Sequence, residues 1–511
     1  MDKAVKKVLI LGGGSAGWLT AGVIAAEHGA GLELCLVESP DVPTIGVGEG
    51  TWPSMRDTLR KMGVAEQDFI RECDASFKQG SKFVAWNTGD ASDFYYHPFS
   101  LPQGFFEVNS APFWQSRASA MPFADAVSPQ VQVCERGLAP KQVATPGYAA
   151  VVNYAYHLDA VKFGHFLRKH CTEKLGVTHV VDHVQAVNSS ADGDIESLAT
   201  AGHGSLAADL FIDCSGGASV LLGKHFDEPF VSRQSVLFND RALAVQVPYA
   251  DKKQAIASAT LSTAQRAGWV WDIGLPTRRG VGYVYSSAHS SDSQAEQDLR
   301  AYLEPSVGKK NAGSAELRQL KINPGHRAAF WRKNCVAVGM SAGFIEPLEA
   351  SALALVELSA AMIRDSMPAN RALMDIAARR FNERFLYRWD RVIDFLKLHY
   401  VLSQRRDSDY WRDHCDPASI PERLQELLQL WRYQTPSRLD FVQTEEIFPA
   451  ASYQYVLYGM GFKSEPGPGA RRSEDAALAQ QHFDENAAQT QRLLQGLPPN
   501  RELLDALRQG A

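Results

Sequence analysis

Three glycines near the start of the chain have the spacing of a dinucleotide-binding turn. Gly12, Gly14 and Gly17 fit the pattern G-x-G-x-x-G, and the acidic Glu38 lies 21 residues beyond the last of them. In such a turn the first glycine permits a tight bend, the second lets a pyrophosphate approach the backbone, and the third lets a helix pack closely on a strand. The N-terminus of that helix then faces the phosphates. The pattern therefore predicts a dinucleotide site.

The elements expected around these glycines are those of a Rossmann-type unit. The apolar run at 8–11 predicts a buried strand, the alanine-rich stretch after the glycines predicts a helix, and LELCLVES predicts a second strand that ends at Glu38. A later strand, LAADLFIDCSG, ends in Asp213, Ser215 and Gly216. These three residues either close over the same cofactor or simply cap a turn.

Further along, strands and helices alternate before the chain becomes mostly helical. Strands are expected at 77–86, 178–190 and 268–287, and a strand, a glycine turn and a long helix are expected at 335–365. Further helices are expected at 156–169, 370–405, 420–433 and 476–509, and a linker at 463–475. This order predicts an α/β core with a helical C-terminal part.

Residues 87–150 have few regular patterns and many aromatic residues, prolines and glycines. An irregular insertion of this length is usually functional or disordered, and its aromatic content argues against disorder. Aromatic side chains in polar, loop-like segments indicate an interface or a pocket for a flat apolar ligand. The residues concerned are Tyr95, Tyr96, Phe99, Phe105, Phe106, Phe113 and Trp114.

The composition excludes several classes of protein. The 511 residues include 52 Lys and Arg against 58 Asp and Glu, with a pI near 6.2, so no dedicated nucleic-acid binding is expected. Seven scattered cysteines without a C-x-x-C pair predict a reducing, cytoplasmic setting and no metal site. No apolar run approaches the roughly 18 residues of a membrane span, and the N-terminal apolar run is expected to be a strand rather than a signal peptide.

Four short motifs occur in order along the chain: GGGSAGW at 12–18, GVGE at 46–49, WVWDI at 269–273 and EPLE at 346–349. With them the sequence resembles the flavin-dependent tryptophan halogenases, which belong to the two-component flavoprotein monooxygenases. The likeness runs from residue 6 to about residue 405. W-x-W-x-I-P is the family's distinguishing motif, and Gly274 stands here in place of its proline.

The resemblance implies an α/β flavoprotein monooxygenase-like fold, with a Rossmann-type FAD-binding module, a mixed sheet and a mostly helical C-terminal substrate module. The expected modules are 1–365, with inserted loops at about 87–150 and a sheet segment at about 230–320, and 366–511. The implied cofactor is FAD, delivered as FADH2 by a separate NAD(P)H-dependent flavin reductase. The residues expected to hold it are Gly12, Gly14, Ser15, Ala16, Gly17, Glu38, Gly48, Glu49 and Gly339.

The resemblance also implies catalytic residues. In the family, reduced flavin and O2 oxidise a halide to hypohalous acid, which passes through a tunnel to a lysine beside the aromatic substrate. The stretch CDASFKQGSKFVAW places that lysine at Lys78, with Lys82 as a decoy, although either lysine could instead be a surface solubiliser. Glu349 is expected to stabilise the cationic ring intermediate and accept the ring proton. Glu346 is the alternative residue for this role. The plain structural explanation is that a glutamate just before a helix complements the positive end of the helix dipole.

The halide, chloride or bromide, is expected against the backbone N–H groups of Ser351 and Ala352, where a helix begins. The family usually has E-S-T-G at this point, whereas this chain has E-A-S-A from Glu349. Changed side chains leave the backbone donors in place, but alanine in place of glycine alters the shape of the pocket.

For the substrate, YYHPF matches a family stretch and places His97 and Phe99 beside an indole ring, while Phe448 falls where the family has a tryptophan. Family members that take free tryptophan hold its amino-acid end with a tyrosine pair and a glutamate. Here TPSRLDFVQTEEIF has no tyrosine pair and has Gln443 at the glutamate position. Buried polar contacts carry such discrimination, so indole or an indole-like compound is expected rather than free tryptophan.

Trp269, Trp271 and Ile273 are expected to wall the tunnel, and the two tryptophans also suit packing on one strand face. Two alternatives stay open. If Gly274 opens the flavin face, the chain is a monooxygenase that hydroxylates an aromatic substrate; if its site is degenerate, it is a flavin-binding protein without catalysis. We expect a monomer or homodimer with no nucleic-acid or membrane partner.

Overall fold

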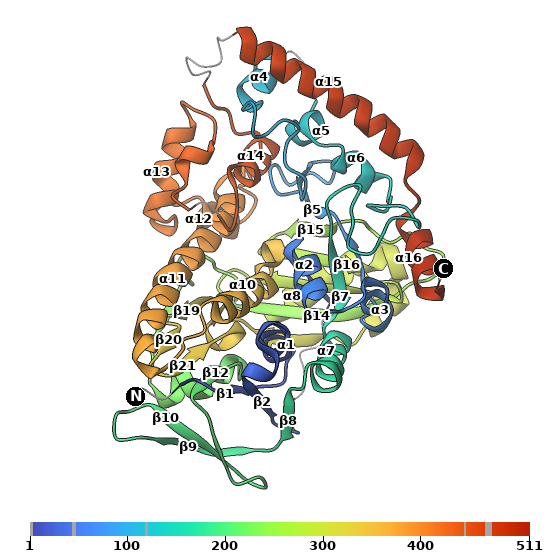
Figure 1. Cartoon of the computed structure of the whole chain (residues 1–511). Coiled ribbons are helices and arrows are strands. Elements are labelled where there is room, and N and C mark those ends of the chain that lie inside the picture. The colour runs from blue at the N-terminus through green and yellow to red at the C-terminus, as the bar shows by residue number, and fades with distance from the viewer. Residues whose placement is uncertain (1–3, 43–47, 118–120, 444–445, 466–472, 511) are drawn as a thin grey trace. The chain divides into compact units, whose positions relative to one another are not determined.

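We describe the protein from a computed structural model (Figure 1), which describes residues 4–42, 48–117, 121–443, 446–465 and 473–510. The chain divides into two compact units of three segments each. The first unit comprises Met1–Ala75, Leu158–Arg233 and Asn323–Trp389, and the second Ser76–His157, Gln234–Ile322 and Asp390–Ala511. The module boundary expected at residue 365 falls inside the third segment of the first unit. The predicted modules are therefore a different partition of the chain and stay a prediction.

The first unit is built on a six-stranded sheet. From edge to edge its strands are β20 (Trp331–Arg332), β21 (Cys335–Ala337), β12 (Leu210–Asp213), β1 (Lys7–Leu11), β2 (Glu33–Glu38) and β8 (Thr178–Val181). All neighbours are parallel except β20 and β21. Every residue of β1 after Lys7 is buried, as expected for a parallel strand whose two faces are both covered.

Helices and two small sheets complete the first unit. The helices are α1 (Ser15–His28), α2 (Ser54–Lys61), α3 (Glu66–Glu72), α7 (Ala160–Lys174), α10 (Ser351–Asp365) and the start of α11 (Arg371–Val401). The antiparallel sheets are β9 (Val184–Ser189), β10 (Ile195–Thr200) and β11 (Ser205–Ala207), and β13 (Phe230–Ser232), β19 (Gly325–Arg327) and β22 (Gly343–Phe344). In Figure 1, α1 and α7 lie side by side.

The helix expected from residue 156 begins later, at Ala160. Residues Ala155–Asp159 form strand β7, in which all five residues are buried, and His157 pairs with Ser76 of β4 (Ser76–Lys78). Asp159 then caps α7, because its carboxylate accepts hydrogen bonds from the first N–H groups of the helix. The prediction of a helix was wrong for residues 156–159. They form a strand by pairing with β4, which is far away in the sequence, so no local pattern indicates it.

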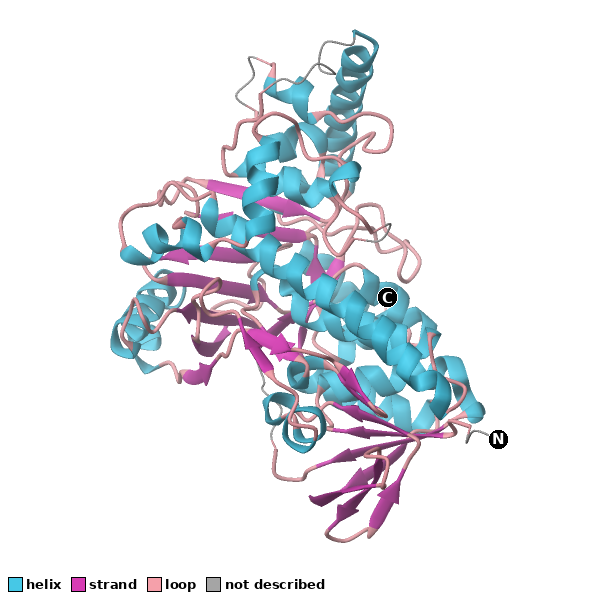
Figure 2. Ribbon diagram, turned by 90° about the vertical axis from the view of Figure 1, so that its left-hand side faces the viewer, coloured by secondary structure: helices cyan, strands magenta, loops and turns pink. Residues whose placement is uncertain are grey.

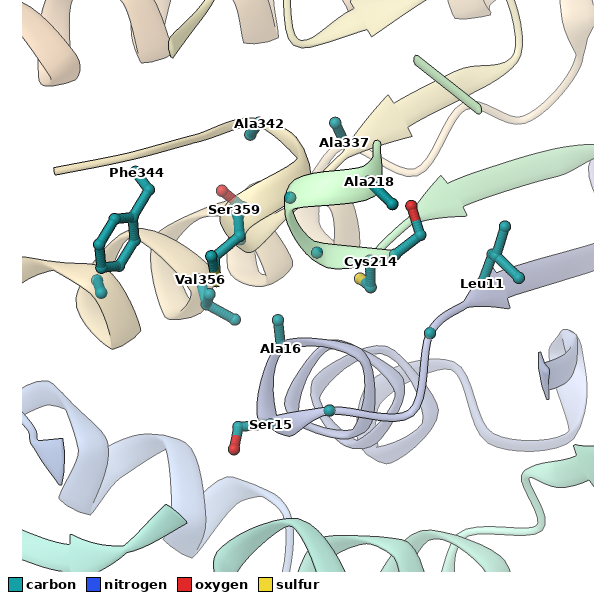
Figure 3. Close-up of a pocket in the computed structure, with 18 of the residues that line it drawn as sticks. Leu11, Ser15, Ala16, Cys214, Ala218, Ala337, Ala342, Phe344, Val356 and Ser359 are labelled. Atoms are coloured by element: carbon teal, nitrogen blue, oxygen red, sulfur yellow. The ribbon is translucent and has the colours of Figure 1, made fainter. Parts of the chain in front are cut away.

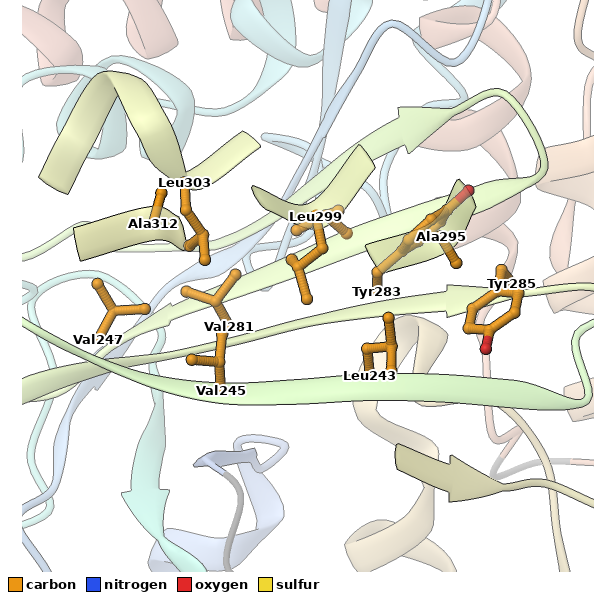
Figure 4. Close-up of a cluster of buried hydrophobic side chains, with 11 residues drawn as sticks. Leu243, Val245, Val247, Val281, Tyr283, Tyr285, Ala295, Leu299, Leu303 and Ala312 are labelled. Atoms are coloured by element: carbon orange, nitrogen blue, oxygen red, sulfur yellow. The ribbon is translucent and has the colours of Figure 1, made fainter. Parts of the chain in front are cut away.

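The second unit is built on a seven-stranded sheet (Figure 2). In spatial order its strands are β18 (Arg318–Lys321), β14 (Arg241–Pro248), β17 (Arg278–Tyr285), β16 (Gly268–Gly274), β15 (Thr260–Gln265), β5 (Gly80–Val84) and β6 (Phe94–Pro98). Only β15 and β5 are parallel. Helices α8 (Asp292–Val307) and α9 (Lys309–Ser314) bury Leu299, Leu303 and Ala312 against valines and tyrosines of β14 and β17 (Figure 4).

The rest of the second unit is largely helical. Its helices are α4 (Ala111–Gln115), α5 (Phe123–Val127), α6 (Gln130–Glu135), α12 (Asp409–His414), α13 (Glu422–Trp431), α14 (Ala450–Gly459), α15 (Ser473–Gly496) and α16 (Asn500–Gln509). The insertion at 87–150 is thus less irregular than expected. Tyr95 and Tyr96 are buried on β6 rather than on a loop, and Phe106 alone among the seven aromatics expected there is exposed.

Most of the expected helices and strands are confirmed in place, including the long helix from residue 371. Part of the linker expected at 463–475 lies outside the described residues. In the described ranges no helix is long and apolar enough to span a membrane. Nor do His, Cys, Asp and Glu side chains of those ranges gather into a group that could hold a metal ion. All seven cysteines are free thiols.

Candidate functional site

The glycine turn joins β1 to α1 and packs against the end of β12. Gly12 has a φ of +117°, and a Cβ built there would lie 2.2 Å from the carbonyl oxygen of Cys214. Both the backbone conformation and the lack of space therefore exclude a side chain at Gly12. A Cβ at Gly14, in contrast, would meet no atom within 4 Å. Gly14 faces open space, as the backbone of a turn that receives a pyrophosphate must.

A cavity of about 640 Å³ in the first unit begins at this turn (Figure 3). Ser15 and Ala16 line it at the start of α1, Cys214 and Ala218 line it after β12, and Val356 lines it from α10. The elements that converge here are therefore the strand ends and helix start of a nucleotide-binding fold. An elongated cofactor has both a glycine cradle and an apolar wall available.

Most of the residues expected to hold the cofactor line this cavity, namely Gly12, Gly14, Ser15, Ala16, Glu38, Glu49 and Gly339. Gly17 and Gly48 are buried and do not contribute to its lining. A Cβ at Gly17 would lie 1.9 Å from the carbonyl oxygen of Gly12, so its role is the close packing of α1 on the turn. Gly46 and Val47 of the second motif lie outside the described residues.

Two carboxylates at the cavity wall have different surroundings. Oε1 of Glu38, at the end of β2, is 2.8 Å from Nε2 of His179, which fixes the orientation of that carboxylate. Glu49 is partly buried, and the loss of solvation raises its pKa to about 7. The charge on Glu49 therefore changes near neutral pH, which makes the electrostatics of this wall sensitive to pH.

The residues at the end of β12 divide between the two roles left open by the sequence. Asp213 is fully buried, and its carboxylate accepts hydrogen bonds from the N–H groups of Ser215, Leu221 and Leu222. Asp213 therefore caps the turn that follows β12. Ser215 and Gly216, which this cap holds in place, line the cavity.

The EPLE segment ends in a left-handed turn just before α10. Glu349 has a φ of +62° and Ala350 a φ of +53°, a region that residues with side chains rarely adopt. Glu349 is 6% exposed and Glu346 is 1% exposed, so both candidate glutamates are buried. Strained backbone of this kind is typical of functional sites, which makes the turn a candidate in its own right.

Ser351 and Ala352, the first two residues of α10, line the same cavity as the glycine turn. The Ser351 hydroxyl is buried, and Oγ makes no hydrogen bond to any residue that the structure describes. Buried hydroxyls nearly always have a partner. An anion at the start of this 15-residue helix would provide one, and the helix dipole would favour it.

In the second unit the two candidate lysines have contrasting environments. Lys78, on β4, is 1% exposed, and its Nζ lies 5.3 Å from the centroid of the Phe99 ring. Lys82, on β5, is partly exposed, and its Nζ lies 2.5 Å from a carboxylate oxygen of Glu135 and 4.1 Å from the centroid of the Phe94 ring. Lys82 is thus engaged in a surface ion pair, whereas Lys78 presents a buried ammonium group beside an aromatic face.

His157 is a residue near Lys78 that sequence reasoning missed. The β4–β7 register pairs Lys78 with Ala155 and Ser76 with His157, which places Lys78 and His157 diagonally on one face of the pair. His157 Nε2 lies 2.8 Å from Oγ1 of Thr260. Burial, and then the charge of Lys78, hold the pKa of His157 well below its usual value. The imidazole is therefore neutral, so Lys78 has no protonated histidine on this face.

Aromatic rings gather around the expected substrate residues of the second unit. The Phe448 and Phe395 rings are stacked with centroids 3.9 Å apart, and the His97 ring lies 5.5 Å from Phe395 and 6.5 Å from Phe448. His97 Nε2 is 2.9 Å from Oγ of Ser452, which fixes the ring. These rings pack on one another, and Phe395 is a member of the cluster that the sequence did not single out.

Trp269, Trp271 and Ile273 alternate along β16, which is buried throughout its length. The Trp271 ring packs over Gly282 of the neighbouring strand, where a Cβ would come within 2.0 Å of it. The packing role expected for these tryptophans is therefore present, and their role in a tunnel stays a prediction. A Cβ at Gly274 would lie 3.0 Å from a methyl group of Ile256, so the missing proline leaves no opening at this position.

The sequence was compared with known proteins. The profile of the family described as tryptophan halogenase matches residues 7–474. The chain belongs to the tryptophan halogenase family. A crystal structure of a tryptophan halogenase from Shewanella frigidimarina matches with a TM-score of 0.97 at 53% identity, over 99% of this chain and 98% of that chain. Tar14, a tryptophan C-6 flavin-dependent halogenase from taromycin biosynthesis, matches with a TM-score of 0.92 at 32% identity, over 98% and 100%.

Among relatives compared by sequence, the 7-chloro-L-tryptophan 6-halogenase KtzR of Kutzneria sp. strain 744 is 31% identical over 98% of this chain and 99% of its own. Membership of the family confirms the predicted α/β fold with a Rossmann-type FAD-binding module. It also makes the chain an enzyme, a flavin-dependent halogenase of an aromatic compound. The family uses FAD, a halide and O2, and depends on a separate flavin reductase.

Proposed function

We propose that this halogenase uses FADH2 and O2 to oxidise chloride or bromide to hypohalous acid and then halogenates indole or an indole-like compound. The observation that carries the proposal is the cavity of the first unit. Its wall combines the glycine turn with the buried hydroxyl of Ser351 at the start of α10, which has no hydrogen-bond partner among the described residues. One cavity thus offers a dinucleotide cradle and an anion position. A flavin halogenase needs both.

The residues of the cavity fit the cofactor. Gly14 leaves open the space that a side chain would fill, and Ser15 and Ala16 present the start of α1 to a pyrophosphate. When bound, reduced flavin with O2 supplies the oxidising equivalent that converts halide and a proton into hypohalous acid and water. The chain's own task is to hold the halide against the N–H groups of Ser351 and Ala352 and to exclude bulk water.

We assign the transfer step to Lys78. Its buried ammonium group would donate a hydrogen bond to the oxygen of hypohalous acid and polarise the oxygen–halogen bond. The ring carbon then attacks the halogen, the oxygen–halogen bond breaks, and the ammonium group transfers a proton to the departing hydroxide, so that the oxygen leaves as water. The proton released later from the ring balances the one that Lys78 gives up. Because His157 is neutral, it places no second positive charge beside the ammonium group of Lys78.

We assign the ring proton to Glu349. Attack on the halogen leaves a positive charge on the ring, which a carboxylate stabilises before it accepts the proton from the substituted carbon. Burial of Glu349 strengthens this interaction because the local dielectric is low. Glu346, five residues before the first residue of α10, is the buried alternative.

The segment before Phe448 supports an indole-like substrate over free tryptophan. Two carboxylates of its described residues accept hydrogen bonds from the segment itself or from a neighbouring residue. The Asp440 carboxylate accepts hydrogen bonds from Trp431 Nε1 and the Ser437 N–H, and the Glu446 carboxylate accepts one from the Gln443 N–H. Both carboxylates thus already bond to the protein, and the segment contains no tyrosine pair, which supports an indole-like substrate. The names of two relatives describe halogenation of tryptophan or chlorotryptophan, so free tryptophan is the competing substrate.

The experiment is a product assay with a flavin reductase, NADH, FAD and either halide. Indole, 3-methylindole and L-tryptophan serve as a matched series, and products are identified by mass. We expect halogenated indole, with kcat/KM at least about tenfold above that for tryptophan, since an unheld zwitterion costs binding energy. A preference for tryptophan would overturn the substrate assignment. A hydroxylated product, or no product from any of the three compounds, would overturn the halogenase proposal.

For its setting, we propose the cytoplasm, with the flavin reductase as separate partner and the enzyme as monomer or homodimer. The seven free thiols support a reducing compartment. The net charge of −6 supports a small neutral aromatic ligand over a polyanion.

A further inference from the structure

The side chain of Trp52 contacts the left-handed turn at Glu349 and Ala350. Trp52 Nε1 donates a hydrogen bond of 2.7 Å to the main-chain carbonyl oxygen of Glu349. Within the turn, the N–H of Ala350 donates to the carbonyl oxygen of Pro347 at 2.9 Å. Two successive residues with side chains in the left-handed region are unfavourable, so this conformation persists only where its surroundings fix it. The bond from Trp52 is such a contact.

Trp52 is itself anchored to α10 through the helix that follows it. Helix α2 begins at Ser54, whose hydroxyl donates to the Glu357 carboxylate at 3.3 Å, and Thr58 one turn later donates to the same carboxylate at 2.7 Å. Glu357 lies on α10, the helix that follows the left-handed turn. The segment 52–58 is thus bonded both to the turn and to the helix behind it. The donor of Trp52 is therefore held in place.

From these contacts we infer that Trp52 is a positioning residue for the proposed halogenation. Its indole N–H keeps Glu349 and Ala350 in the left-handed turn, and the turn sets the direction of the Glu349 side chain and of the first N–H groups of α10. Trp52 acts through the main chain of Glu349 and touches neither halide nor ring in this assignment. The inference rests on the proposed roles of Glu349 and Ser351, and it adds the residue that holds them.

Ala350 offers a way to separate positioning from packing. Glycine populates the left-handed region freely, so Ala350→Gly removes much of the conformational cost that the Trp52 bond offsets. If the bond holds the turn, Ala350→Gly will restore function to a Trp52→Phe variant, which keeps the ring but lacks the N–H. If Trp52 only packs, the glycine will restore nothing.

The first unit contains a matched control. Trp331 Nε1 donates to the carbonyl oxygen of Lys333 at 3.1 Å, and Lys333 has a φ of +55°. Trp331→Phe therefore removes the same kind of bond, from an indole to the carbonyl of a left-handed residue, away from the EPLE segment. Effects common to both variants report general packing, and effects confined to Trp52→Phe report the turn.

The experiment compares wild type, Trp52→Phe, Ala350→Gly, the double variant and Trp331→Phe. Trp52→Phe should lower kcat about tenfold and raise the halide KM, with the KM for the aromatic compound unchanged, since one hydrogen bond is lost at the turn. The double variant should recover most of this loss. Ala350→Gly alone and Trp331→Phe should stay within about threefold of wild type.

A second readout needs no activity. Hydrogen exchange of the amides at 348–353, in protein without added flavin, should be about tenfold faster in Trp52→Phe and unchanged in Trp331→Phe. Unchanged exchange in Trp52→Phe, or a double variant as impaired as Trp52→Phe, would overturn the inference. If wild type forms no halogenated product, the proposed function fails, while the exchange data still decide whether Trp52 holds the turn.

Discussion

The hydroxyl of Ser351 is the single-residue feature that points most directly to an anion. It is buried at the first residue of α10, it lines the cavity of the glycine turn, and it has no hydrogen-bond partner among the described residues. A buried hydroxyl in this state costs the fold free energy unless a ligand satisfies it. The nearby backbone N–H groups and the helix dipole add to the same preference for negative charge.

The variant Ser351→Ala tests whether this hydroxyl contacts the halide. Loss of a hydrogen bond to a charged group should raise the KM for chloride and bromide about tenfold or more, while flavin affinity stays near wild type and thermal stability without halide does not fall. Halide titrations in the steady state measure it. Ser366→Ala, just beyond the other end of α10, is the control and should behave as wild type. A halide KM unchanged in Ser351→Ala would place the halide elsewhere.

At the scale of elements, helices α2 and α10 are joined by a buried carboxyl group. Glu357 is 4% exposed and accepts hydrogen bonds from Ser54 and Thr58. Burial outweighs these two donors and raises the pKa of Glu357 to about 8, against an ordinary value of 4.5. The folded state therefore binds a proton that the unfolded state has already released.

This linkage predicts a pH-dependent stability. Between pH 4.5 and about 8 the folded state holds more protons, so stability falls as pH rises, with a slope of up to about 1.4 kcal/mol per pH unit from Glu357. Glu357→Gln should flatten that fall and unfold at a higher temperature than wild type at pH 8. Thermal unfolding at pH 5 and pH 8 measures it, with the exposed Glu304→Gln as control. An equally steep fall in Glu357→Gln would contradict this account.

Short-range sequence patterns predicted those elements that depend only on neighbouring residues. The glycine turn, the first two strands and the helix from residue 371 follow from glycine spacing and apolar periodicity, and they lie where expected. The start of α7 was misplaced because β7 depends on pairing with β4, some 80 residues away. The Trp52 bond to Glu349 spans 297 residues, and the positive φ values at Glu349 and Ala350 depend on that distant contact. Such features cannot be read from neighbouring residues.

At the scale of the whole molecule, the chain forms two compact units, each made of three segments of the sequence. The candidate flavin, halide and carboxylate residues belong to the first unit. Lys78 and the rings around His97, Phe395 and Phe448 belong to the second. The account therefore assigns formation of hypohalous acid and acceptance of the ring proton to residues of the first unit, and halogen transfer to Lys78 of the second. Formation and transfer should be separable by mutation.

Lys78→Ala, compared with Lys82→Ala, tests this central claim most directly. The measurement follows halogenated indole and, in parallel, hypohalous acid trapped by monochlorodimedone in solution. We predict that Lys78→Ala binds flavin normally and still releases trappable hypohalous acid, but halogenates indole at least about a hundredfold more slowly, while Lys82→Ala matches wild type. Halogenation by Lys78→Ala at a rate near that of wild type, or an equal loss in both variants, would contradict the account.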